Sequence, residues 1–254
     1  MKEELLFYNA YEQFYSMTEH SNAFKKYCIE AFGADFSQDG FSDLSQINLL
    51  LSYIPKRENM HILDIGCGNG KMLKYLQEQT NSFIYGFDYS ESAIHTAISS
   101  KYNNSEFKVG IIGEIEYSKD NFDVITSMDS IYFALDMTQF VGQVYEWLKP
   151  NGVFLIGYQE GDIMPKTPNS ETTEIAQALK ENKFTYKVID ITYDTYCMLR
   201  KKREVILKNE NEFINEGIVE WFNMVVGQTD YATVTFDDYC KNNARYIYIA
   251  SKYN

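Results

Sequence analysis

Two aspartates and three glycines form the part of this chain whose chemistry is easiest to interpret. Gly66, Gly68 and Gly70 stand at alternate positions directly after a short apolar run, and Asp64 lies two residues before the first of them. Glycines let a backbone turn sharply and approach a ligand closely, and a helix that begins at such a turn offers unpaired N–H groups. A strand, a glycine-rich turn and a helix in this order predict a nucleotide-binding crevice.

The position of Asp64 indicates which nucleotide is bound. The glycines follow the spacing G-x-G-x-G, not the G-x-G-x-x-G of dinucleotide sites, and Lys71 comes next. A carboxylate at this strand end would repel a pyrophosphate and attract an ammonium or sulfonium group. Asp88 ends the following apolar run, where a carboxylate can accept both hydroxyls of a ribose. Together these residues favour S-adenosylmethionine as the cofactor.

A parallel sheet is needed to bring these residues to one edge. Predicted strands cover 60–65, 82–88, 106–110, 122–127, 153–158, 185–192 and 245–251. Predicted helices between them cover 69–79, about 90–101, 137–148 and 171–182. Runs that are almost entirely apolar are typical of strands buried on both faces. We therefore predict an α/β fold with a doubly wound, mostly parallel, seven-stranded sheet.

Helical segments flank this alternation. Three predicted helices precede the first strand, at 3–17, 21–33 and 43–54, and Ser21 and Gly33 are the expected ends of the second. A long helical stretch at 194–227 is too long for a connection, so we interpret it as an inserted cap. Its basic cluster at 200–203 is interpreted as a solvated helix face. We predict one domain, with a lid over 1–58, a cofactor-binding core over 59–193 and 244–254, and a cap over 194–243.

The composition limits the classes of partner. The formal net charge of −13 over 254 residues disfavours nucleic acid, which is bound by clustered Lys and Arg. No apolar run approaches the length of a membrane span, and the first residues lack a signal-peptide core. Four scattered cysteines without a Cys/His cluster favour a reducing compartment and no metal site. We expect a cytoplasmic protein that acts on a small molecule, without a nucleic-acid or membrane partner, as a monomer or a homodimer.

Four sequence blocks resemble the class I S-adenosylmethionine-dependent methyltransferases of the small-molecule type. They lie at 63–70, 86–90, 121–125 and 148–152, and the resemblance covers about 59–160. It implies a set of cofactor-binding residues: Asp64, Gly66, Cys67, Gly68, Gly70, Asp88, Tyr89, Ile112, Ser127, Met128 and, from the first helix, Tyr15. Asp64 would contact the methionyl amino group, Asp88 the ribose hydroxyls, and Tyr89 the adenine.

One position departs from the family pattern. An Asp after the third strand often bonds the adenine amino group, and that position here is Ile111, followed by Ile112 with its backbone N–H. Adenine binding at this edge would then rest on backbone groups and apolar packing. The missing Asp also motivates an alternative, a catalytically inactive regulatory or carrier protein that binds S-adenosylmethionine.

The predicted substrate pocket is acidic and aromatic. The candidate catalytic residues follow strand ends and are Asp129, Tyr132 and Glu160. The candidate substrate-binding residues are Tyr8, Tyr11, Phe41, Tyr158 and Trp221, although the tyrosines of the first helix could equally pack on the core. Carboxylates and aromatic ring faces both attract cations. We therefore predict methyl transfer from S-adenosylmethionine to nitrogen or oxygen of a small molecule, and an amine suits the charge of this pocket.

Overall fold

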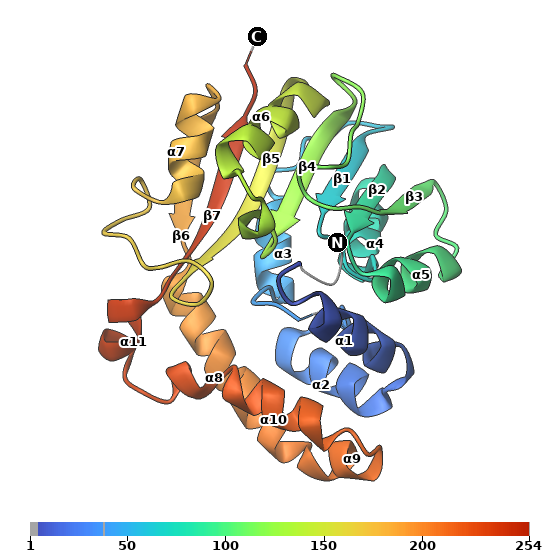
Figure 1. Cartoon of the computed structure of the whole chain (residues 1–254), viewed down its shortest axis with the longest axis vertical. Helices are drawn as coiled ribbons and strands as arrows, with labels where there is room; N and C mark the ends of the chain where they lie inside the picture. The colour runs from blue at the N-terminus through green and yellow to red at the C-terminus, as the bar shows by residue number, and fades with distance from the viewer. Residues whose placement is uncertain (1–4, 38, 254) are drawn as a thin grey trace.

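The computed structural model describes residues 5–37 and 39–253 and contains a seven-stranded sheet (Figure 1). Its strands are β1 (His61–Ile65), β2 (Phe83–Asp88), β3 (Ser105–Val109), β4 (Phe122–Met128), β5 (Leu148–Glu160), β6 (Thr185–Asp190) and β7 (Ala244–Ser251). Their order is β3-β2-β1-β4-β5-β7-β6, and β7 runs antiparallel to both of its neighbours while the other pairs are parallel. The predicted doubly wound, mostly parallel sheet is confirmed.

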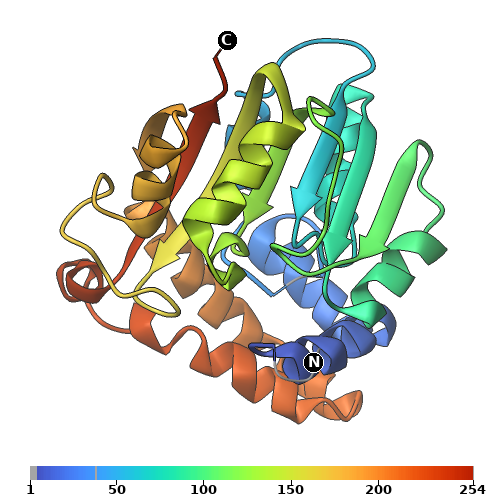
Figure 2. The ribbon, with the colours of Figure 1, turned by 45° about the horizontal axis from the view of Figure 1, so that its top comes forward.

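Helices cover both faces of the sheet (Figure 2). On one face α3 (Leu44–Leu51), α4 (Lys71–Thr80) and α5 (Glu91–Ser99) pack against the strands. On the other face lie α6 (Met137–Trp147) and α7 (Glu174–Glu181). The central strand β4 is therefore buried along its whole length, and its polar residues Asp123, Thr126 and Ser127 are buried with its apolar ones.

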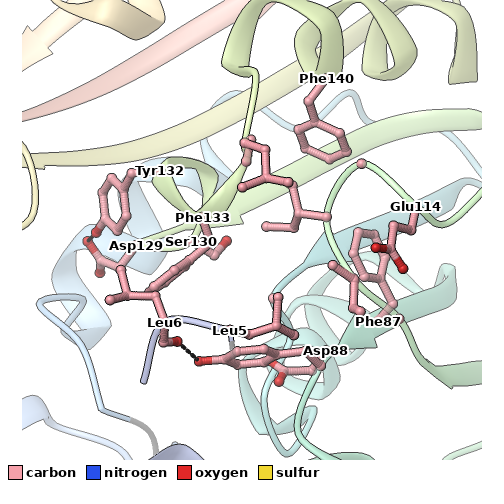
Figure 3. A pocket seen from close by; sticks show the side chains of 18 of the residues that line it. Leu5, Leu6, Phe87, Asp88, Glu114, Asp129, Ser130, Tyr132, Phe133 and Phe140 are labelled. Carbon is pink, nitrogen blue, oxygen red and sulfur yellow. Dashed lines mark hydrogen bonds between the residues drawn. The ribbon is translucent and has the colours of Figure 1, made fainter. Parts of the chain in front are cut away.

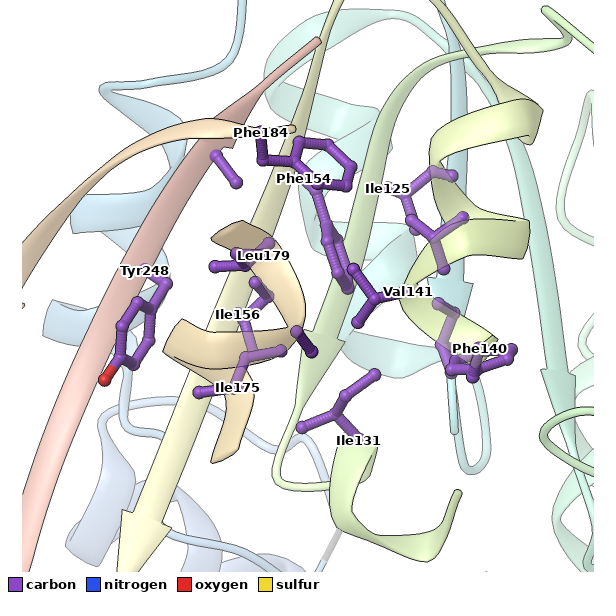
Figure 4. Packing of buried hydrophobic residues seen from close by; sticks show 14 of the residues in the cluster. Ile125, Ile131, Phe140, Val141, Phe154, Ile156, Ile175, Leu179, Phe184 and Tyr248 are labelled. Atoms are coloured by element: carbon purple, nitrogen blue, oxygen red, sulfur yellow. The ribbon is translucent and has the colours of Figure 1, made fainter. Parts of the chain in front are cut away.

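In the core beneath α6 and α7, apolar residues at the helix period pack against apolar residues at the strand period. Val141 of α6 and Leu179 of α7 pack with Phe154 and Ile156 of β5 in one cluster (Figure 4). The strand presents every second residue and the helices every third or fourth, so both elements place apolar side chains in the same layer.

The helices from the two ends of the sequence form a third layer at the carboxyl edge of the central strands (Figure 1). Here α1 (Tyr8–His20) and α2 (Asn22–Phe32) share an apolar core with α8 (Thr192–Lys208) and α10 (Val219–Gly227). This layer lies across the strand ends, so the lid and cap segments lie together beside the predicted cofactor edge.

A hydrogen-bonded contact also joins lid and cap. The Glu216 carboxylate accepts bonds from Ser21 Oγ at 2.6 Å and from the N–H groups of Asn22 and Ala23 at 3.1 and 2.9 Å. Ser21 itself caps α2, and Gly33, with a φ of 84°, ends it, as the sequence predicts. A carboxylate at a helix N-terminus is stabilised by the free N–H groups there.

The helical stretch predicted at 194–227 is confirmed, but it consists of several helices. After α8 the chain breaks into α9 (Glu210–Asn215), α10, the short turn η3 (Asp230–Ala232) and α11 (Phe236–Asn242). Asn209 ends α8 because its side-chain amide bonds back to the Val205 carbonyl, and Gly217, with a φ of 72°, follows α9. These breaks turn Ile214 outward, where it is 49% exposed.

Other element boundaries differ by smaller amounts. Helix α1 extends to His20, while residues 3 and 4 of the predicted first helix lie outside the described residues. The turn expected at 149–152 lies within β5 as an irregularity, since Phe122 pairs with Leu148 and Val124 already pairs with Val153. Across residues 5–37 and 39–253, every helix is too short or too polar to cross a bilayer.

Candidate functional site

A cavity of about 520 Å³ lies where β1, β2 and β4 end (Figure 3). It is bounded by the strand ends, by the loop after β3, and by α1 from the lid. Of the residues predicted from sequence, its walls include Tyr11, Tyr15, Gly66, Asp88, Tyr89, Ile112, Met128, Asp129 and Tyr132. In Figure 3, Asp129, Tyr132 and Phe133 lie on one side, and Phe87, Asp88 and Glu114 lie on the other.

The glycine turn after β1 is shaped by its neighbours. Gly66 has a φ of 70°, and a Cβ added to it would lie 2.5 Å from the Cβ of Ser130. A Cβ on Gly68, with a φ of 52°, would collide with the hydroxyl of Tyr15. Only glycine allows this backbone to pass between Ser130 and Tyr15. The N–H groups of 66–68 are bonded to the Phe87 carbonyl and to Asp88, and Gly66 is the residue of this stretch that lines the cavity.

The rest of the turn packs inward. Gly70 has a φ of 76°, and a Cβ on it would lie 2.9 Å from the ring of Phe107, which makes it a packing position of the turn. The Cys67 side chain is buried against Gly86, and burial, first, with the charge of Asp88 raises the pKa of its thiol. A protonated, enclosed thiol is a small packing group and not a nucleophile.

Asp64 and Asp88 are buried carboxyl groups with no cationic partner among the described residues. The Thr126 hydroxyl donates to Asp64 Oδ1 at 2.6 Å, while Asp88 accepts the N–H groups of Gly68 at 2.9 Å and Ser90 at 2.8 Å. Burial raises the pKa of Asp64 to about 7, with a smaller contribution from Asp88. Burial likewise raises the pKa of Asp88 to about 6, although the two backbone bonds oppose the rise. Asp88 lines the cavity and Asp64 does not, and a ligand that brings positive charge and hydroxyl donors would complement such carboxylates.

Arg245 organises the opposite side of the cavity, and sequence reasoning missed it. It is fully buried at the start of β7 and pairs with both carboxylate oxygens of Asp129, one of them at 2.9 Å. The same carboxylate accepts the N–H of Phe41 and the hydroxyl of Ser42, each at 3.2 Å. Asp129 is thus engaged by several donors, which suits an anchor of the site better than a free base.

Aromatic rings form the wall above Asp129. The Tyr132 hydroxyl donates to Asp129 Oδ1 at 3.2 Å, which leaves its oxygen lone pairs to accept another hydrogen bond. Burial, followed by the charge of Asp129, raises the pKa of Tyr132 well above its ordinary value. Tyr11 and Tyr89 lie with their ring centroids 6.0 Å apart, and Phe133 lies 6.4 and 6.2 Å from them. The Tyr89 hydroxyl also donates to the Leu6 carbonyl at 3.0 Å, so the described start of the chain covers the cavity (Figure 3).

A side chamber of about 70 Å³ continues from the main cavity behind Asp129. Lys202 lines it and is 3% exposed, so the expectation of a solvated face is wrong for this residue. Its ammonium donates to Gln228 Oε1 at 3.0 Å, and Gln228 in turn donates to Asp39 Oδ1 at 2.8 Å. Burial lowers the pKa of Lys202, while Asp39 opposes the fall. Asp162 also lines this chamber, and burial raises its pKa.

Several predicted residues lie outside the main cavity. Phe41 lines the side chamber, Tyr8 packs edge-on against Tyr89 at 5.6 Å, and Trp221 packs against Phe14 at 5.7 Å in the lid–cap core. Ser127 is buried 2.7 Å from the Ser130 hydroxyl, and Tyr158 belongs to the core under α6 and α7.

Glu160 is the candidate catalytic residue with the least support from its placement. It is buried at the end of β5 and accepts bonds from the Thr167 N–H at 3.1 Å and hydroxyl at 2.9 Å. This carboxylate holds a loop and lines neither chamber. Within 5–37 and 39–253 no cluster of three or more His, Cys, Asp or Glu is placed to hold a metal ion.

Two signals could have revealed the missed cations. Lys202 follows Met198 and Leu199 and precedes Val205 and Ile206 at helical spacing, which places it on the buried face of α8. Arg245 is a cation within a strand that is otherwise apolar or aromatic, and a buried arginine needs a carboxylate partner. The partner, Asp129, is 116 residues away, and only the fold brings the two together.

Comparisons with known proteins agree on one family. A family model described as a methyltransferase domain matches residues 56–223. Phosphoethanolamine N-methyltransferase 1 of Arabidopsis thaliana is 26% identical over 209 residues, which cover 74% of this chain and 42% of that protein. Phosphoethanolamine N-methyltransferase of Plasmodium falciparum (isolate 3D7) is 26% identical over 189 residues, covering 73% of this chain and 68% of that protein. The chain thus spans less than half the length of the plant relative.

Solved structures show the same fold. Phosphoethanolamine N-methyltransferase 2 of Haemonchus contortus, solved in complex with S-adenosyl-L-methionine, superposes with a TM-score of 0.78 at 20% identity, covering 96% of this chain and 60% of that one. The cyclopropane synthase MmaA2 of Mycobacterium tuberculosis gives a TM-score of 0.69 at 16% identity, covering 95% of this chain and 98% of that one.

Proposed function

Since the chain belongs to the class I S-adenosylmethionine-dependent methyltransferase family, we propose that it transfers the methyl group of S-adenosylmethionine to the nitrogen of a small amine. One observation carries the proposal: a cavity with acidic and aromatic walls lies directly beside the glycine turn. Asp88, Asp129 and Asp39 face it, and Lys202 in the side chamber is the sole cationic side chain among the described residues that line either space. Such walls attract a cation at both the cofactor and the acceptor position.

The residues at the glycine turn fit this cofactor. Asp64 would accept the methionyl ammonium, and the remaining lone pairs of Asp88 would accept the two ribose hydroxyls. The backbone at 66–68 would lie along the methionine and ribose, and Tyr15 beside Gly68 would meet the carboxylate. When bound, the cofactor supplies an activated methyl group on sulfur, which needs positioning more than chemical activation.

The chain's own contribution is then to orient the acceptor and exclude water. The Tyr132 hydroxyl already donates its hydrogen bond to Asp129, so the Tyr132 oxygen can accept a hydrogen bond from an N–H of the amine. That bond would direct the nitrogen lone pair away from Tyr132 and toward the cofactor. Arg245 holds Asp129 in place and is a positioning residue. Methyl transfer forms a C–N bond, breaks the C–S bond and leaves S-adenosylhomocysteine. The nitrogen releases one proton, which we assign to solvent because Tyr132 stays protonated near neutral pH.

Lys202 indicates which group the acceptor molecule carries at the end opposite its amine. Among the described residues the buried ammonium of Lys202 has an amide oxygen as its one hydrogen-bond partner, so it can still donate to an anionic group. The side chamber therefore suits an amine that carries a phosphate or carboxylate at its other end. Phosphoethanolamine, the substrate named in the relatives, has this form. A reducing, cytoplasmic setting belongs to the same proposal, and the four cysteines are free.

The proposal is tested by measuring S-adenosylhomocysteine release with matched acceptors. We expect release with phosphoethanolamine and its monomethyl form, weaker release with ethanolamine, and none with a catechol. Asp88→Asn should abolish release through lost cofactor binding. Turnover confined to hydroxyl acceptors would contradict the proposal, and cofactor binding without turnover of any amine would favour the inactive alternative.

A further inference from the structure

The wall at the Ile111 end of the main cavity combines apolar surfaces with a few polar groups, as a purine site requires. The loop 110–114 after β3 and the helix α6 form this wall, with Phe87, Ile112 and Phe140 as its apolar surfaces (Figure 3). Within the described chain the N–H of Ile112 donates to no backbone carbonyl, so it can serve a ring nitrogen. An exocyclic amino group needs an acceptor as well, and Ile111 supplies no side-chain acceptor.

Gln143 offers that acceptor from the other side of the wall. It lies on α6 one turn after Phe140, and both residues line the cavity. Its Nε2 donates to Glu116 Oε1 at 3.3 Å, whereas its Oε1 is buried without a hydrogen-bond partner among the described residues. Because an ionised carboxylate can only accept, the bond to Glu116 settles which end of the amide is the oxygen.

An unpartnered buried oxygen is costly in the free protein. Few buried acceptors in folded proteins lack a hydrogen-bond partner. An acceptor without a partner in the chain can be satisfied by a donor on a ligand. A small rotation about the broad terminal torsion of the Gln143 side chain turns Oε1 toward the cavity. A donor from the ligand would then complete the group.

The other polar groups of this wall are less suited. Glu114 and Gln139 are exposed to solvent. Asp136 is exposed too, and its carboxylate already accepts the N–H of Gln139 at 2.8 Å as the cap of α6. Hydrogen bonds to groups in water contribute less discrimination than those to enclosed groups. Gln143 is the half-buried member of the set.

We propose that the side-chain oxygen of Gln143 accepts a hydrogen bond from the 6-amino group of the cofactor's adenine. Helix α6 thereby takes over the recognition that an acidic side chain after β3 would otherwise provide. The inference rests on the proposed function, because it presumes that an adenosyl cofactor occupies this cavity. It also implies that Gln143 distinguishes adenine from a purine that lacks the amino group.

The test compares two ligands by isothermal titration calorimetry on the full chain. One is S-adenosylhomocysteine, and the other is its analogue with hydrogen in place of the 6-amino group. We expect the native protein to bind the first about five- to tenfold more tightly, as for one net hydrogen bond. Gln143→Leu should weaken S-adenosylhomocysteine to the level of the analogue and leave the analogue unchanged, so that the ratio falls to about one. Gln143→Met, an unbranched apolar replacement, serves if the leucine variant does not fold.

Matched controls separate this residue from its neighbours. Glu116→Ala removes the bond to Nε2 but keeps Oε1, so the preference for adenine should persist. Glu114→Leu should also keep it. A preference that survives Gln143→Leu and Gln143→Met, one that is lost in Glu114→Leu instead, or no preference in the native protein would overturn the inference while leaving the proposed function intact. Failure of the native protein to bind either ligand would overturn both.

Discussion

Replacing Asp64 by asparagine should stabilise the ligand-free protein and weaken its cofactor binding. The two residues have the same shape, and the asparagine oxygen can still accept the bond from Thr126 Oγ1. The substitution removes the negative charge that the fold encloses at the end of β1. Opposite effects on stability and binding are expected wherever a charge is kept for a ligand and not for the fold.

The size of the stability effect follows from the pKa of Asp64. Burial raises that pKa from an ordinary 3.8 to about 7, a difference of about three pKa units. Each unit corresponds to 1.36 kcal/mol, so the ionisable group lowers the free energy of unfolding by about 4 kcal/mol at pH 7. The sign follows from linkage. Because the unfolded chain gives up this proton more easily, the native protein loses stability as pH rises from about 4 to about 7. At pH 5 the loss is only (5 − 3.8) × 1.36, or about 2 kcal/mol.

Thermal and urea unfolding of the ligand-free Asp64→Asn variant and of the native protein, at pH 7 and at pH 5, measure this difference in the free energy of unfolding. At pH 7 the gain of about 4 kcal/mol corresponds to a Tm about 8 to 16 °C higher, and the gain should fall by about half at pH 5. Glu146→Gln, which removes an exposed carboxylate paired with Lys119, should change stability by less than about 0.5 kcal/mol. A variant that is no more stable than the native protein at pH 7, or whose gain does not shrink at pH 5, would refute the reasoning.

The same variant should bind S-adenosylhomocysteine at least about tenfold more weakly at pH 8, because a hydrogen bond to a charged group is lost. For the native protein, affinity should rise as pH increases from 5 to 8, since ligand binding favours the ionised forms of Asp64 and Asp88. The Asp64→Asn variant should show a shallower rise. An affinity that does not change with pH in the native protein would contradict the proposed role of both carboxylates.

Three further substitutions probe the acceptor side. Tyr132→Phe should lower kcat for the amine by about tenfold, since the acceptor of its N–H is lost, with unchanged affinity for S-adenosylhomocysteine; an unchanged kcat would remove Tyr132 from the mechanism. Lys202→Met should raise KM for phosphoethanolamine by about tenfold or more but leave KM for ethanolamine unchanged, whereas equal shifts in both would contradict the assignment of an anion site. Arg245→Met should lower the free energy of unfolding by about 3–5 kcal/mol, because Asp129 is left buried and unpaired. Part of that stability should return in the double variant with Asp129→Asn, and no recovery in urea unfolding would mean that the charge pair is not the cause.

Local patterns were sufficient for the sheet and for the edge that holds the glycine turn. Each strand was predicted within a few residues because apolar residues dominate most of the strands that the sheet buries, and capping at Ser21 and Gly33 depends on adjacent residues only. The cap was predicted less well, because its breaks at Asn209 and Gly217 depend on bonds and on how the short helices pack with α2. Periodicity alone could not show that one helical pattern folds into several helices.

The sequence by itself determined the fold class, the family, and the two carboxylates beside the glycine turn, since these depend on neighbouring residues and on the order of strands. Only the tertiary structure decided which groups surround the acceptor. Asp39, Asp129, Lys202 and Arg245 come from four distant segments, and their pairing depends on how lid, sheet and cap pack together. Burial also lowers the pKa of Lys202, because the basic helix face on which the sequence places this lysine packs inward at that residue.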